Sequence, residues 1–257
     1  MPLHVHAWGP DEAPRVVCLH GVRGHGRVFR GLAERLDSFR VVAPDLRGHG
    51  HSSWEPPWTL EHHVEDVLEL LGAEPPFALV GHSFGGRLVM ELRAAAPAVV
   101  SRAVLLDPAI WVPPPVALHV AERERAERIF TTADEAIELR YRTSRLLSTP
   151  RGLLEQEMED HLVAGGDGYR YRYAQSAVVA ALGELARTPP GQSALRVPTL
   201  LVRGAETDVV PRDLVDWYRE IGEPLEVVEV PGGHNVLWDA FDETTAAVVR
   251  FLEDARA

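Results

Sequence analysis

One stretch of the sequence limits the fold more than any other, because residues 77–94 predict a strand, a sharp turn and a helix in direct succession. Residues 77–80 are apolar and follow two prolines, as in a buried strand. The pattern Gly-x-Ser-x-Gly follows, with Ser83 at its centre, and helix-compatible residues continue to position 94. Such a tight turn strains the serine backbone, and side chains at Gly81 and Gly85 would collide with the neighbouring strand and helix. The stretch therefore predicts a serine hydroxyl raised at a sheet edge, before a helix N-terminus that favours negative charge.

Four further motifs stand at the ends of apolar runs. His20-Gly21 follows an early run, the sequence Asp-Leu-Arg-Gly-His-Gly at 45–50 follows the next, Asp208 follows a late one, and Gly233-His234 lies near the end. With a nucleophile, an acid and a histidine in this order, the sequence resembles the α/β-hydrolase superfamily over nearly its whole length. The resemblance implies an α/β fold with a mostly parallel sheet flanked by helices.

The resemblance also implies roles for individual residues. Ser83 would be the nucleophile, His234 its base and Asp208 the acid, since family loops place the carboxylate just ahead of an apolar pair and a proline. Asp107, at the end of the apolar run 103–106, is the rival for the acid, because some members of the superfamily use that place. The backbone N–H groups of Val22 and Phe84 would form the oxyanion hole.

A substrate pocket can be proposed only from apolar neighbours of these motifs. The side chains that suit a hydrophobic acyl site are Trp111, Val236, Leu237 and Trp238. Each of them is also compatible with an ordinary place in the core.

The composition changes at the three prolines 113–115, which can neither continue a helix nor pair in a sheet. The sequence from about 116 to 187 has helical periodicity and is rich in arginine and glutamate, and it predicts no buried parallel strand. We therefore expect an α/β core at 1–112 and 191–257, with a helical cap at 113–190 inserted after the strand that ends near Asp107. Tyrosine and arginine alternate at 169–173, which leaves open that Arg170 or Arg172 recognises a substrate anion.

Charge and composition exclude several classes of partner. The formal charge of −12 opposes binding to nucleic acid or an anionic membrane. No apolar stretch approaches the roughly 20 residues of a membrane span, and the first residues do not look like a secretion signal, so we expect a cytoplasmic protein without membrane insertion. The only cysteine, Cys18, lies in an apolar run and should be buried.

Histidines are frequent, but their spacing does not indicate a metal. His49 and His51 lack the further ligands of a metallohydrolase, so we expect neither a metal nor a cofactor. Asp45 and Arg47 are expected to brace their turn. A helix is expected at 59–71, opened by Thr59, with His62 and His63 on its solvated side.

The favoured function is a carboxylesterase that cleaves a small-molecule ester of small to medium acyl chain through an acyl-enzyme. A serine nucleophile, rather than an aspartate, disfavours dehalogenase and ordinary epoxide hydrolase chemistry. Carbon–carbon bond hydrolysis, lactone opening, and thioester or amide hydrolysis use the same residues and stay open, since a fold does not fix a substrate. A cofactor-free lyase or oxygenase and a non-catalytic receptor are weaker alternatives, and the oligomeric state is not predicted.

Overall fold

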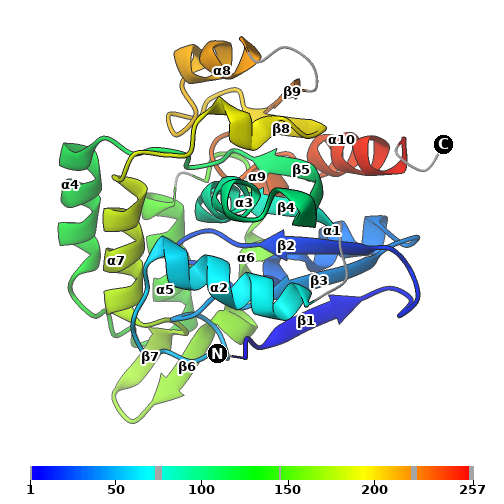
Figure 1. Ribbon diagram of the computed structural model, residues 1–257. Coiled ribbons are helices and arrows are strands. Elements are labelled where there is room, and N and C mark those ends of the chain that lie inside the picture. Colours follow the sequence, from blue (N-terminus) through cyan, green and yellow to red (C-terminus); the bar gives the residue numbers. More distant parts are fainter. Residues whose placement is uncertain (1, 73–76, 145, 221–224, 255–257) are drawn as a thin grey trace.

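The computed structural model describes residues 2–72, 77–144, 146–220 and 225–254. Its main feature is a seven-stranded sheet in the order β1-β3-β2-β4-β5-β8-β9 (Figure 1). The edge strand β1 runs antiparallel to β3, and all other neighbouring strands are parallel. The strands are β1 (Val5–Trp8), β2 (Arg15–Leu19), β3 (Arg40–Pro44), β4 (Phe77–His82), β5 (Val100–Leu106), β8 (Thr199–Gly204) and β9 (Leu225–Val230). The expected α/β architecture is confirmed.

The central strands are covered on both faces. In β2, Val17 and Leu19 join one apolar cluster while Val16 and Cys18 join the other, as the alternation of a strand requires. The first cluster packs under α2 (Leu60–Leu71), α3 (Phe84–Ala95), η3 (Gln192–Leu195) and α8 (Arg212–Arg219). The second packs under η1 (Gly26–Phe29), α1 (Arg30–Arg35), α9 (Val236–Asp239) and α10 (Phe241–Glu253). A short turn, η2 (Pro97–Val99), leads from α3 into β5.

A long segment, residues 114–185, separates β5 from β8, and we call it the insert. It comprises α4 (Pro114–Glu124), α5 (Ala133–Thr143), α6 (Arg151–His161), β6 (Leu162–Gly165), β7 (Gly168–Tyr171) and α7 (Gln175–Leu185). In Figure 1, α4, α5 and α7 lie to the left of the sheet, and the β6–β7 hairpin lies below it. The insert has its own apolar cluster, and two residues from outside it, Val22 and Trp238, pack against that cluster. The insert is therefore packed onto the part of the core that carries the predicted site.

The sequence predicts helices throughout the insert, but the structure also contains two strands there. β6 and β7 form an antiparallel hairpin, in which Leu162 pairs with Tyr171 and Gly165 with Gly168. Gly168 has a φ of 134°, which favours glycine over residues with a Cβ. The alternation of tyrosine and arginine is thus a strand with Tyr171 buried, and α6 ends at His161, directly before the hairpin.

Helix α2 begins at Leu60, after Thr59, close to the predicted start. One expectation about it is wrong, because His63 is buried and not solvated. Its ring meets the ring of Phe84 edge-on, with centroids 5.3 Å apart. Helix periodicity alone could not show that α3 covers this side of α2.

The helices in the described part of the chain are short compared with a bilayer. α10 has 13 residues, whereas a spanning helix needs about 20. None of the described helices combines the length and the apolar character needed to cross a membrane.

Candidate active site

The turn between β4 and α3 holds Ser83 in a strained conformation. Its φ is 54° and its ψ is −116°, outside the regions that residues with a Cβ prefer. A Cβ at Gly85 would lie 2.0 Å from the carbonyl oxygen of Leu19, and one at Gly81 would lie 2.3 Å from that of Gly85. No side chain fits at either position. The structure has the strand, sharp turn and helix that the sequence predicts.

Three side chains far apart in the sequence form one hydrogen-bonded chain. His234, between β9 and α9, has its Nε2 2.9 Å from Ser83 Oγ. Its Nδ1 lies 2.6 Å from Oδ2 of the fully buried Asp107. A carboxylate only accepts, so Nδ1 carries the proton and Nε2 is left with its lone pair toward the serine. The arrangement can take a proton from the Ser83 hydroxyl.

The partner of His234 corrects the sequence analysis, which assigned the carboxylate to Asp208 and kept Asp107 as the rival. Asp107 follows β5, the strand next to β4, so its side chain emerges beside the serine turn. In the sequence, Asp107 stands directly at the end of a buried strand, whereas the family pattern of the later loop favours Asp208. The structure thus places Asp107, the rival residue, at Nδ1 of His234.

The loop after β8, which contains Asp208, supports the Asp107 carboxylate. The backbone N–H of Gly204 donates to Oδ1 at 3.0 Å, and the hydroxyl of Thr207 donates to Oδ2 at 2.7 Å. The backbone N–H of Asp107 donates to Val202 O at 2.7 Å, and its φ is 40°. Sequence reasoning missed Thr207, because nothing in the sequence links it to Asp107.

The loop after β2 lies directly against the serine. A Cβ at Gly21 would be 3.1 Å from Ser83 Cβ. His20 fixes this loop: its Nε2 accepts from Leu46 N at 2.9 Å, so its protonated Nδ1 donates to Gly21 O at 2.8 Å. Phe84 is the first residue of α3, where a backbone N–H has no partner within the helix. These positions fit the predicted oxyanion donors Val22 and Phe84, whose role stays a prediction.

His82 is a second histidine at the site, and sequence reasoning gave it no role. Its Nε2 donates to the carbonyl oxygen of His234 at 3.1 Å. Burial and, after it, the neighbouring His234 lower the pKa of His82 to about 4. The ring is therefore neutral at physiological pH, and it holds the backbone that positions His234.

The predicted pocket residues separate into three groups. Val236 and Leu237 are buried in the apolar cluster beneath α9 and α10, so the structure gives them a core position. Trp111 is 43% exposed, and its place in a pocket stays a prediction. Trp238 packs against both that cluster and the cluster of the insert, which puts it at the junction of core and insert.

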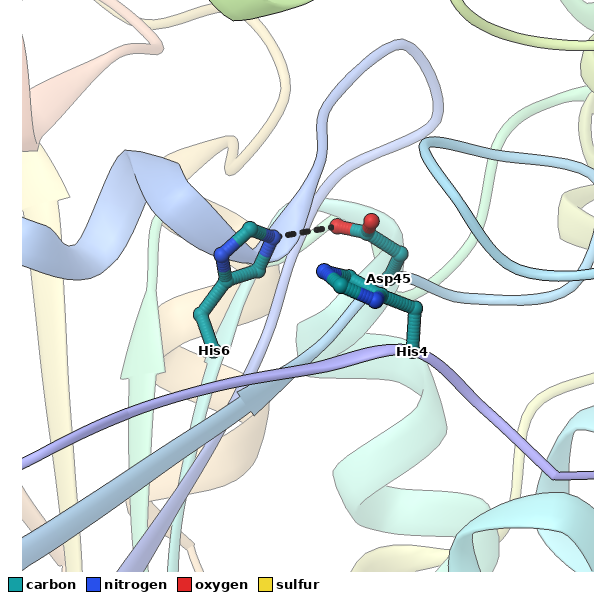
Figure 2. Close-up of side chains that lie close together, drawn as sticks. All are labelled: His4, His6 and Asp45. Atoms are coloured by element: carbon teal, nitrogen blue, oxygen red, sulfur yellow. Dashed lines mark hydrogen bonds and ion pairs between the residues drawn. The ribbon is translucent and has the colours of Figure 1, made fainter.

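A group with metal-ligand chemistry lies elsewhere, at β1 and the loop after β3. The donor atoms of His4, His6 and Asp45 lie within 4.8 Å of one another, and Figure 2 shows the bond from His6 to Asp45 with the His4 ring beside it. Asp45 accepts from His6 at 3.2 Å, from Gly26 N at 2.7 Å and from His51 N at 2.9 Å. Although burial alone would raise it, these bonds hold the pKa of Asp45 well below its usual range. The carboxylate is occupied as a brace of the turn, as expected for Asp45.

Comparisons with known proteins agree with the fold. A family model described as the alpha/beta hydrolase fold matches residues 14–241. Lipase LipV of Mycobacterium tuberculosis is 35% identical over 254 residues, covering 96% of each chain. The 3-hydroxybutyrate-oligomer hydrolase of Cupriavidus necator is 31% identical over 258 residues, covering 89% of this chain and 85% of that one. The crystal structure of E-2-(acetamidomethylene)succinate hydrolase superposes with a TM-score of 0.85 at 25% identity, over 98% of this chain and 95% of that one.

Proposed function

Because the chain belongs to the α/β-hydrolase family, we propose that it is a serine hydrolase whose nucleophile is Ser83, with His234 as base and Asp107 as the acid that orients it. The observation that carries the proposal is the hydrogen-bonded chain from Asp107 Oδ2 through the His234 ring to Ser83 Oγ. A serine hydroxyl is a weak nucleophile at neutral pH and needs a base within hydrogen-bond reach. At 2.9 Å, His234 Nε2 is within that reach.

In the first half of the reaction, Ser83 Oγ attacks the substrate carbonyl carbon and His234 Nε2 takes the hydroxyl proton. The Asp107 carboxylate stabilises the resulting imidazolium and keeps its ring oriented. When the tetrahedral intermediate collapses, the bond to the leaving group breaks and His234 returns the proton to that group. Water then cleaves the acyl-enzyme by the same steps and restores the serine.

The developing oxyanion would be met by the backbone N–H groups of Val22 and Phe84. The placement of the β2 loop against Ser83 and of Phe84 at the helix start supports this role. Loss of one such donor typically costs a factor of about 10² to 10³ in rate.

We further propose that residues 113–190 act as a cap on a core formed by 1–112 and 191–257. The burial of Ser83, which is only 8% exposed, supports a cap. Contacts between the insert and the site support a cap: Asn235 Nδ2 donates to Ser144 O at 2.7 Å, and Arg23 Nη1 to Glu124 Oε1 at 3.3 Å. Substrate entry would require these contacts to open.

The substrate class we propose is a carboxylic ester of small to medium acyl chain. A lipase and an oligomer hydrolase among the relatives support ester cleavage. The test is a panel of p-nitrophenyl esters of rising acyl length, assayed with the wild type, with Ser83→Ala and with the exposed control Ser193→Ala. We expect turnover by the wild type and the control and almost none by Ser83→Ala. Turnover by Ser83→Ala at the wild-type rate would refute the acyl-enzyme.

A further inference from the structure

A buried arginine lies where the insert meets the proposed site. Arg140, on α5, is only 5% exposed. Its Nη2 donates to the carbonyl oxygen of Arg23 at 3.2 Å, one residue after Val22. Its Cζ lies 5.7 Å from the ring centre of Tyr171 and 5.9 Å from that of Trp238, four residues after His234. The guanidinium thus stands between the oxyanion loop, the segment after the histidine and the hairpin of the insert.

This guanidinium is not neutralised by direct contact. Within the described ranges, Arg140 forms no ion pair, and its buried Nε has no hydrogen-bond partner. Among the described residues, the one acceptor that meets an N–H group of Arg140 is the neutral carbonyl oxygen of Arg23, at Nη2. A buried charge without a counter-charge is strongly destabilising, so a position of this kind favours an anionic partner.

The acidic side chains around Arg140 are already paired with other cations. Glu124 contacts Arg23 at 3.3 Å and Arg128 at 3.7 Å. Glu157, whose pKa Arg140 helps to lower, contacts His25 at 3.0 Å. Among the described residues, Arg140 is therefore the buried cation of this region that has no carboxylate partner.

Arg170 and Arg172, the two arginines that the sequence offers for anion recognition, both have partners of their own in the structure. Arg170 pairs with Glu127 at 2.9 Å and with Asp167 at 2.7 Å, and Arg172 Nε donates to Asp160 O at 2.9 Å. Arg170 already has two carboxylate partners at the surface. Arg140 is therefore the better candidate for binding an anion.

The charge of Arg140 also acts on a residue beside the nucleophile. It contributes, after burial and His234, to the lowered pKa of His82, the residue before Ser83. Because Arg140 also binds the carbonyl oxygen of Arg23, next to the predicted oxyanion donor Val22, a group bound at Arg140 would belong to the molecule that presents its carbonyl to Ser83.

We propose that Arg140 binds a free carboxylate of the substrate, so that the enzyme acts on esters that carry a second, ionised carboxyl group. The inference rests on the proposed function, since it names the substrate class of that same site. An arginine side chain binds a carboxylate through two parallel N–H···O bonds, and Nε and the unused hydrogens of the guanidinium supply them. The rings of Tyr171 and Trp238 limit the directions from which the anion can approach.

The test compares substrates whose second carboxyl group is either free and ionised or esterified. The monoethyl esters of succinic, glutaric and adipic acid are assayed in a pH-stat against the corresponding diethyl esters. The enzymes are the wild type, Arg140→Gln, and Arg142→Gln as a control on the exposed side of the same helix. Loss of one partner of a buried, hydrogen-bonded charge pair costs a factor of about 10² or more. We expect the wild type to prefer at least one monoester, and Arg140→Gln to lose about that factor in kcat/KM for it while keeping its diethyl ester activity.

A wild type that prefers the diethyl esters, or an Arg140→Gln variant that loses both activities equally, would overturn the inference and leave the proposed function standing. A wild type that cleaves neither series contradicts the proposed function instead. In that case calorimetry of glutarate binding to the wild type and to Arg140→Gln decides about the carboxylate site alone. Binding that the variant lacks supports the site, and equal or absent binding refutes it. Matching thermal melts of the variants show that each has folded.

Discussion

At the scale of single residues, the carboxylate of Asp107 is fixed before any substrate arrives. It accepts from Gly204 N, Thr207 Oγ1 and His234 Nδ1, and its backbone N–H is held by Val202. A carboxylate held by several donors needs little reorganisation when the imidazolium forms beside it. Asp107 is therefore expected to be the acid on which activity depends.

The first prediction compares two aspartates. Asp107→Asn should lose a factor of about 10³ to 10⁴ in kcat, because an amide no longer stabilises the imidazolium or selects the required tautomer. Asp208→Asn should stay close to the wild type. Steady-state kinetics on one p-nitrophenyl ester measures both, and the opposite order would return the role to Asp208.

The second prediction concerns Thr207, whose hydroxyl donates to Asp107 Oδ2 and accepts from Val209 N at 3.1 Å. Thr207→Val keeps the shape of the side chain but removes a hydrogen bond to a charged group, worth about 1.5–3 kcal/mol. We expect a roughly tenfold loss in kcat with little change in KM, since the residue acts through Asp107. Thr188→Val, at an exposed position, is the control. An unchanged kcat in Thr207→Val would show that the backbone donors suffice.

At the scale of elements, the strands of the sheet could be predicted from the sequence. Parallel strands covered on both faces consist of continuous apolar residues, such as Val16 to Leu19 in β2. The motif around Ser83 could be predicted because its glycines are required by the backbone alone. The β6–β7 hairpin could not, since each strand has only four residues and β7 carries Arg170 between its tyrosines. The partner of His234 could not either, because two loops offered a carboxylate and the choice depends on strand order.

The third prediction separates glycines that the fold requires from glycines that it tolerates. Gly85→Ala places a Cβ against the backbone of Leu19 and should greatly reduce the yield of folded protein. Gly183→Ala, within α7, meets no atom within 4 Å, and should raise the free energy of unfolding by about 0.5–1 kcal/mol. Thermal melts measure both variants. A Gly85→Ala protein as stable as the wild type would contradict the packing of this turn.

At the scale of the whole molecule, buried histidines make stability depend on pH. Desolvation is the main cause that lowers the pKa of five histidines with buried or largely buried rings: His20, His49, His63, His82 and His161. Their folded-state pKa values lie below those of the unfolded chain. The stability linked to them is therefore complete above a pH of about 6.5, and it is lost as the pH falls toward the lowered values.

The fourth prediction tests this linkage at His63, whose pKa burial lowers to about 3. The wild type should lose stability on acidification below a pH of about 6.5, by up to about 1.4 kcal/mol per pH unit for each such histidine. His63→Leu should reduce that slope, whereas His119→Leu, at an exposed position on α4, should not. Urea unfolding between a pH of about 4.5 and 7.5 gives the slopes. Equal slopes in all three proteins would contradict the burial of His63.

The central claim, that His234 and Asp107 activate Ser83 as the nucleophile, is tested most directly by covalent labelling with a p-nitrophenyl alkylphosphonate. The rate of nitrophenolate release and the site of the adduct are read from one reaction, with trypsin giving the peptide 48–87 that contains Ser83. The account predicts one equivalent of label, on Ser83, with labelling at least about 10²-fold slower in His234→Gln and in Asp107→Asn. A label on another residue, or equally fast labelling without His234, would contradict it.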